Sequence, residues 1–185
     1  MTKLVLASTS PARLALLKAG GIDPVTIAPG VDEDAAVAAA KAAGLISTTA
    51  DMVQYLAREK ANAVGNHIES MGALVLGCDS SLEFEGESLG KPHRPEVAVE
   101  RWKNIRGKSG VLHTGHWLID NRRIEIDGSI LTIGKTSSTI VHFADISDAE
   151  IEAYVATREP LKVAGAFTID GIGGAFIRSI EGDSH

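Results

Sequence analysis

Two short runs of consecutive apolar residues constrain the fold of this chain more than any other feature. Leu4–Ala7 lies in a predicted strand, Lys3–Ala7, and Ala73–Cys78 forms a second strand in which apolar and polar residues do not alternate. Strands of this kind are covered on both faces, as in sheets that have helices packed against them. The first run also leads into a helix, because Ser10 is a good N-cap and Pro11 suits the first helical position.

Helices and strands alternate early in the chain, and strands dominate after residue 110. The other predicted elements are a helix at Pro11–Ala19, a strand at Val25–Ala28, helices at Asp34–Ala43 and about 48–66, a hairpin at Leu82–Leu89, a helix at Pro95–Ile105, β structure at Val111–Phe143, and a helix from the capping box Ser147–Glu150 to about Thr157. Asp120-Asn121 and Asp127-Gly128 predict turns within the β region. We expect a mixed α/β (α+β) fold, with a twisted mixed β-sheet flanked by helices in a single domain over residues 1–185.

Charge and composition exclude several classes of function. The formal net charge is −6, and no run of Lys or Arg offsets it, so we expect no nucleic-acid partner. No apolar stretch approaches the roughly 20 residues that span a bilayer, and the N-terminus does not resemble a secretory signal. Cys78 is the only cysteine, which excludes an internal disulfide and suits a reducing compartment. These features predict a cytoplasmic protein with no membrane partner.

The segment Leu6–Arg13 (LASTSPAR) joins the first strand to the first helix. A helix N-terminus presents free backbone N–H groups and a positive dipole end, and Ser8 and Ser10 add hydroxyl groups there. Arg13 lies in the first helical turn, where a cation is disfavoured, and this placement indicates an anionic partner. The alternative is that Ser10 only caps the helix and Arg13 pairs with a surface carboxylate.

Lys60 and Asp79 are the two charged residues next to predicted apolar structure. Lys60 falls on the same helical stripe as Val53, Ala57 and Val64, so its ammonium either reaches the rim of the core or meets an anion inside. Asp79 directly follows the strand Ala73–Cys78, and ligands of open α/β sheets gather beyond the carboxyl ends of strands. Its alternative role is to cap the next turn.

Other candidates are weaker when taken alone. Lys91 lies in a stiff Gly90-Lys91-Pro92 loop, and Glu33 lies in an acidic loop where it could meet a metal, but such residues are more often only solvated. His113 and His116 are three residues apart in a predicted strand, which makes them a poor zinc pair. The sequence has neither a P-loop nor a Gly-x-Ser-x-Gly nucleophile motif.

In this order and spacing, the segments resemble the Maf family of nucleotide pyrophosphatases over nearly the whole chain. The segments that carry the resemblance are LVLASTSPAR (4–13), Asp32-Glu33, AREKA (57–61), LVLGCDSS (74–81), LGKP (89–92), HTGHWLI (113–119), SDAEIEAYVATREPL (147–161), and AGAF followed by IEGD. The resemblance implies two lobes with the site in a central cleft. It also implies a further C-terminal segment after His185.

The resemblance further implies a reaction and roles for individual residues. A nucleoside triphosphate is hydrolysed to its monophosphate and pyrophosphate through attack of water on the α-phosphorus, with Asp79 as the proton acceptor. The residues implied to line the phosphate and metal site are Ser8, Arg13, Glu33, Lys60 and Lys91, with Glu33 and Asp79 the metal candidates. The implied cofactor is a divalent cation, Mg²⁺ or Mn²⁺, and the implied assembly is a homodimer.

Three positions tied to base selection differ from the dTTP/UTP subgroup of that family. This chain has Ala12, Ser80 and Asp170 where that subgroup has Arg, Thr and Gln, and Lys162-Val163 replaces its Asp-Lys. Asp170 is closer to the subgroup that prefers 7-methylguanosine triphosphate, which has Glu there, but that subgroup's Trp at position 12 is missing. The sequence leaves the base undecided, and modified or non-standard bases stay among the candidates.

Two other hypotheses compete with this one. The first is a non-catalytic regulator of cell division or septum formation, or a simple nucleotide-binding protein. The second is a pyrophosphatase of the inosine-triphosphate type. Pyrophosphate release from a panel of nucleotides with Mg²⁺ distinguishes all of them.

Overall fold

The computed structural model describes residues 2–123 and 129–183, which form two compact units. The first unit comprises Met1–Asp79 and Thr114–Thr136, and the second comprises Ser80–His113 and Ser137–His185. The helices are α1 (Pro11–Ala19), α2 (Glu33–Ala42), α3 (Thr49–Gly65), α4 (Pro95–Ile105) and α5 (Asp148–Ala156), with short 3₁₀ turns η1 (Ile68–Ser70), η2 (Glu159–Lys162), η3 (Ala164–Ala166) and η4 (Ile172–Phe176). The strands are β1 (Leu4–Ala7), β2 (Val25–Ile27), β3 (Leu74–Phe84), β4 (Glu87–Leu89), β5 (Ser109–Asp120), β6 (Leu131–Phe143) and β7 (Ile177–Glu181).

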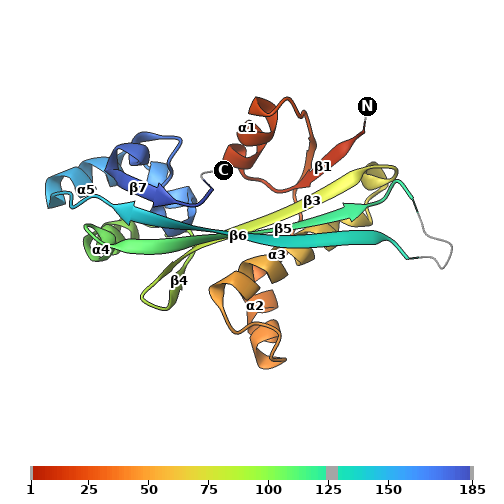
Figure 1. Ribbon diagram of the computed structural model, residues 1–185, viewed down its shortest axis with the longest axis horizontal. Helices are drawn as coiled ribbons and strands as arrows, with labels where there is room; N and C mark the ends of the chain where they lie inside the picture. Colours follow the sequence, from red (N-terminus) through yellow and green to blue (C-terminus); the bar gives the residue numbers. More distant parts are fainter. Residues whose placement is uncertain (1, 124–128, 184–185) are drawn as a thin grey trace. The chain divides into compact units, whose positions relative to one another are not determined.

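The strands form a mixed sheet, as the sequence predicts. The order is β2-β1-β3-β5-β6-β7, and β4 pairs with β3 beside this path. β1 is parallel to both β2 and β3, whereas β3 with β4 and β6 with β7 are antiparallel pairs. In the first unit, Figure 1 shows α1 above the strands and α2 and α3 below them. No helix in the described ranges is long and apolar enough to cross a membrane.

Local sequence signals account for most element boundaries. The helix α4 has the predicted bounds, and the other predicted helices agree to within one or two residues. The capping box at the start of α3 is formed, because Thr48 Oγ1 accepts from Asp51 N at 3.0 Å and Asp51 Oδ2 accepts from Thr48 N at 3.0 Å. The predicted hairpin Leu82–Leu89 is also confirmed, and its turn lies at Glu85-Gly86, with φ of 51° and 84° between the paired residues Phe84 and Glu87. The predicted turn Asp127-Gly128 lies outside the described residues.

The prediction that the second apolar strand ends at Cys78 is wrong. The strand β3 continues without interruption to Phe84, so Asp79 lies inside a strand rather than after one. The early part of β3 pairs with β1 as far as Gly77, and the late part pairs with β4 from Leu82 onward. The polar Asp-Ser-Ser stretch lies between these two pairings, in a strand that also has β5 as a neighbour in the sheet, so the apolar pattern stops there although the strand does not.

The core of the first unit lies between α3 and the sheet. Val5, Val75, Ala61 and Val64 are fully buried there. The helix approaches the sheet closely at Gly77, where an added Cβ would lie 2.1 Å from the Ala57 carbonyl oxygen. Only glycine fits at that contact, because the obstacle is the backbone of α3 and cannot move aside.

The core of the second unit is built around Trp102. The indole is fully buried, packs edge-on against Phe143 and Tyr154 with ring centroids 5.7 and 5.6 Å away, and donates from Nε1 to the Ala166 carbonyl at 2.8 Å. The other tryptophan, Trp117, is only partly buried and packs at the border of the first unit's core.

We predict that Gly77→Ala lowers the free energy of unfolding by about 3 kcal/mol, the upper range for overpacking, because α3 must move away from the sheet. Gly20→Ala is the matched control, since its added Cβ would lie 3.4 Å from the nearest atom, an ordinary contact. Urea denaturation measures both variants. Equal stability of the two would contradict the close approach of α3.

Candidate active site

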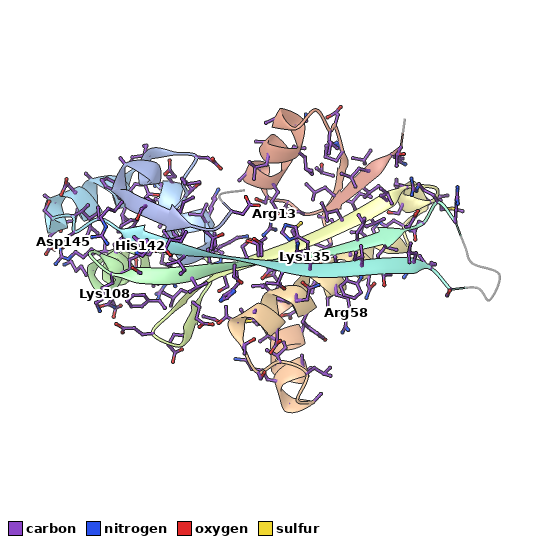
Figure 2. The ribbon with its side chains drawn as sticks, viewed as in Figure 1. Arg13, Arg58, Lys108, Lys135, His142 and Asp145 are labelled. Carbon is purple, nitrogen blue, oxygen red and sulfur yellow. The ribbon has the colours of Figure 1, made fainter. Side chains whose placement is uncertain are left out.

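The turn after β1 gathers hydroxyl groups and a guanidinium at the N-terminus of α1. Ser8 is buried and its Oγ accepts from Ser10 N at 3.1 Å, while Ser10 Oγ caps the helix by accepting from Arg13 N at 3.5 Å. Arg13 extends from α1 toward the strands (Figure 2), where its Nη1 donates to the Cys78 carbonyl at 2.8 Å and to Ser8 Oγ at 3.4 Å. The guanidinium is therefore held against β3, one residue before Asp79.

A buried ammonium lies between two carboxylates next to this turn. Lys60 Nζ, on α3, donates to Asp79 Oδ1 at 2.6 Å and lies 2.8 Å from Glu33 Oε1. Lys60 and Asp79 are only 5% and 7% exposed, whereas about half of the Glu33 side chain is exposed. Of the two alternatives for Lys60, the structure therefore supports the one in which its ammonium meets an anion inside the protein. The sequence placed Glu33 in a loop, but it is the first residue of α2, after the N-cap Asp32.

The surroundings of Asp79 make it a stronger base than an exposed aspartate. Burial raises the pKa of the Asp79 carboxyl, and the positive charges of Lys60 and Arg13 oppose that rise. Burial also raises the pKa of the neighbouring Cys78 thiol, which is a small buried side chain of the core. A buried carboxylate held by an ammonium, with a guanidinium nearby, is suited to accept a proton beside a polyanion.

Two of these carboxylates fit a divalent cation. Glu33 and Asp79 direct one oxygen each toward the same ammonium, which is a point where positive charge is favoured. Carboxylate oxygens suit Mg²⁺ and Mn²⁺, and Mg²⁺ is usually held by one or two carboxylates together with substrate phosphates and water. Among the described residues no larger metal-binding group of His, Cys, Asp and Glu occurs. The protein's share of such a site would therefore be these two side chains.

The remaining predicted residues are distributed over both units. Ala12 is exposed on the first turn of α1, in the first unit with Ser8, Ser10, Arg13, Glu33, Lys60 and Asp79. Ser80, Lys91 and Asp170 belong to the second unit. Ser80 lies within β3 and Lys91 is exposed after β4. The convergence of Lys91 with Arg13, Lys60 and Asp79 on one pocket stays a prediction.

Asp170 lies in a segment that is fixed by a neighbouring carboxylate. Glu159 accepts hydrogen bonds from the backbone N–H groups of Ile172 at 3.0 Å and Gly173 at 2.9 Å, and from the Tyr154 hydroxyl at 2.9 Å. Although burial alone would raise it, the pKa of Glu159 is lowered by these hydrogen bonds. The carboxylate thus stabilises the turn that presents Asp170.

His116 lies in β5 near Arg13, and the sequence analysis considers it only as a zinc ligand. Burial lowers the pKa of His116, and the positive charge of Arg13 acts in the same direction. The Cys78 carbonyl that accepts from Arg13 was not predicted either, because a backbone group carries no side-chain signal.

The fold and these residues define a class: a mixed α/β protein with a guanidinium, a buried ammonium and paired carboxylates beside its first strand. The chain belongs to the Maf family, since the family model described as "Maf-like protein" matches residues 3–185. It is similar to the nucleoside triphosphate pyrophosphatase of Leifsonia xyli subsp. xyli, with 56% identity over 98% of this chain and 84% of that protein. The protein of the same name from Salinispora tropica is 49% identical over 98% of this chain and 75% of its own.

Two solved structures are more distant from this chain. The Staphylococcus aureus Ham1 protein aligns over 78% of this chain and 73% of its own, with 13% identity and a TM-score of 0.42. A dITP/XTP pyrophosphatase from Mycobacterium abscessus aligns over 78% and 76%, with 16% identity and a TM-score of 0.40.

We predict that Lys60→Met destabilises the protein by about 3 kcal/mol, because it leaves Asp79 buried without its cation. Asp79→Asn should cost much less, since Lys60 keeps Glu33 as a partner. In an Asp79→Asn background, Lys60→Met should therefore lose most of its effect. Thermal unfolding of the two single variants and the double variant measures this coupling, and strictly additive effects would contradict it.

Proposed function

We propose that this protein hydrolyses nucleoside triphosphates to nucleoside monophosphates and pyrophosphate. The observation that carries the proposal is the buried Lys60–Asp79 pair, with Glu33 on its exposed side and Arg13 beside it. Membership of the Maf family and the names of its relatives support the same activity. An acidic protein needs such a local concentration of cations to bind a polyphosphate.

In the proposed reaction, Asp79 accepts a proton from the attacking water. The water oxygen forms a bond to the α-phosphorus, the bond from that phosphorus to the bridging oxygen breaks, and pyrophosphate leaves. Lys60 holds Asp79 Oδ1, and among the described residues no hydrogen bond is made by Oδ2, which is the oxygen we assign to receive the proton. The raised pKa of Asp79 helps this step, because a stronger base takes a proton more readily near neutral pH.

The phosphate groups are the proposed ligands of the remaining polar residues. The guanidinium of Arg13 suits bidentate contact with phosphate oxygens, and Ser8 and Ser10 add hydroxyl donors at a helix N-terminus. Lys60 and Lys91 would add positive charge along the triphosphate. Phosphoryl-transfer catalysis depends mainly on positioning and charge stabilisation of this kind.

A divalent cation, Mg²⁺ or Mn²⁺, is the proposed cofactor, with Glu33 and Asp79 as its protein ligands. When bound, it would supply Lewis-acid stabilisation of the charge that develops on the phosphates and the leaving pyrophosphate. Two carboxylates face the single ammonium of Lys60, so one cation of the protein does not balance both of them. Lys60 would then keep Asp79 ionised and would also attract the negatively charged substrate phosphates.

The proposal also covers base selectivity, oligomeric state and cellular location. We assign base selection to Ala12, Ser80 and Asp170, by the family resemblance. The fixed turn that carries Asp170 supports a specificity role, because a rigid support is needed to read a base by hydrogen bonding. A homodimer and a cytoplasmic location complete the proposal.

We predict that Asp79→Asn retains the fold but reduces kcat for pyrophosphate release by at least about a hundredfold, the usual contribution of a general base. Circular dichroism and a coupled pyrophosphate assay measure the two effects. Glu83→Gln, on the same strand, is the control and should keep wild-type turnover. Wild-type turnover by Asp79→Asn would exclude the assigned role.

We predict that pyrophosphate is released from at least one nucleoside triphosphate with Mg²⁺ or Mn²⁺, and that EDTA abolishes the release. A panel of canonical nucleotides, 7-methylguanosine triphosphate and inosine triphosphate also identifies the preferred base. Preference for inosine triphosphate would favour the hypothesis of a pyrophosphatase of the inosine-triphosphate type. No release from any nucleotide would favour the hypothesis of a non-catalytic protein. In parallel, Glu33→Gln should weaken Mn²⁺ binding, which electron paramagnetic resonance measures without turnover.

A further inference from the structure

The carbonyl of Gly90, directly before Lys91, is held by two donors from distant parts of the second unit. Arg101, on α4, donates from Nη1 to this oxygen at 2.5 Å, and Gly165 N donates to it at 3.2 Å. The contact with Arg101 is the shorter one and is assisted by the guanidinium charge. A third backbone bond, from His93 N to the Leu161 carbonyl at 3.0 Å, fixes the other end of the same loop.

These contacts leave the backbone of Lys91 little freedom. Pro92 restricts the preceding residue to extended conformations, so Lys91 is constrained from its C-terminal side as well. The side chain itself is exposed, and within residues 2–123 and 129–183 it makes no ion pair. The loop thus presents one unneutralised ammonium from a backbone that is fixed at both ends.

Arg101 donates to this carbonyl, and its guanidinium forms no ion pair with a carboxylate in the described part of the chain. The guanidinium is half-buried, and burial lowers the pKa of Arg101. Arg101 is one of the residues that line an open cavity of about 450 Å³, together with Phe84, Glu87, Leu89 and Glu100. Although Glu87 and Glu100 line the same cavity, Arg101 donates to a loop carbonyl.

We propose that Arg101 is a positioning residue, which fixes the Gly90 carbonyl and thereby holds Lys91 in the conformation that binds substrate phosphate. The inference rests on the proposed function, because it assumes that Lys91 binds phosphate. Arg101 acts through the loop and does not touch the substrate. Removing its guanidinium leaves the carbonyl with the longer Gly165 bond only, so the Lys91 ammonium spreads over more positions and binds phosphate less well.

We predict that Arg101→Ala raises KM for the preferred nucleotide about tenfold and changes kcat less than about twofold, since one charge-assisted hydrogen bond is lost. Lys91→Ala should also raise KM, and the double variant should match Lys91→Ala alone, because Arg101 has nothing left to position. Lys103→Ala is the matched control, since Lys103 lies on the same helix and forms only a half-exposed ion pair with Asp148 at 3.4 Å. Additive effects of the two substitutions, or an unchanged KM in Arg101→Ala, would overturn the proposal.

Two further measurements separate positioning from general destabilisation. Guanidinium added at a non-denaturing concentration can enter through the open cavity, so it should lower KM again in Arg101→Ala but not in Lys91→Ala. Arg101→Lys keeps the apolar stem and a donor, and its KM should lie between those of wild type and Arg101→Ala. Failure of both to restore binding in a folded protein would contradict the assigned role.

Amide hydrogen exchange of His93 and Arg94 tests the loop without any enzymatic assay. Exchange should become faster in Arg101→Ala and stay unchanged in Lys103→Ala. If the wild-type protein releases no pyrophosphate, the proposed function fails, yet this comparison still decides whether Arg101 holds the loop. Unchanged exchange in Arg101→Ala would refute the positioning role even in an active enzyme.

Discussion

The buried contact between Lys60 and Asp79 is the interaction on which the candidate site depends. Asp79 would be very costly inside the protein without Lys60, because it would then be a buried ion without a partner, whereas Lys60 without Asp79 still has Glu33. The ammonium fixes the carboxylate on the inner side, and Glu33 joins it from the exposed side. A charge cluster of this kind is weak support for stability and strong support for a functional role.

Much of the fold could be predicted because its signals are local. Pro11, Pro95 and the capping boxes mark helix starts, and the predicted bounds agree with those observed. The end of β3 could not be predicted, since it depends on which strand lies alongside rather than on the side chains of β3 itself. The polar stretch between the β1 and β4 pairings remains a strand, with β5 as its neighbour in the sheet, which a pattern of apolar residues does not reveal.

The candidate site was predictable to a different degree. Arg13 and Lys60 stand out by position alone, because a cation is disfavoured both in the first helical turn and on an apolar helical stripe. Single-residue reasoning could not tell whether Lys60 reaches the rim or meets a carboxylate, since the answer lies on two other elements. Contacts to backbone carbonyls, such as those of Cys78 and Gly90, have no sequence signal at all. In both contacts the donor is an arginine, and only the three-dimensional structure reveals which carbonyl it binds.

The course of the three long strands has a consequence for how the chain can be divided. β3, β5 and β6 each contribute residues to both compact units, so neither unit is one contiguous stretch of the polypeptide. A gene fragment that encodes one unit would end in the middle of hydrogen-bonded ladders and leave open strand edges, which promote aggregation. Evolution and protein engineers can therefore exchange loops and side chains in this molecule more readily than they can exchange halves.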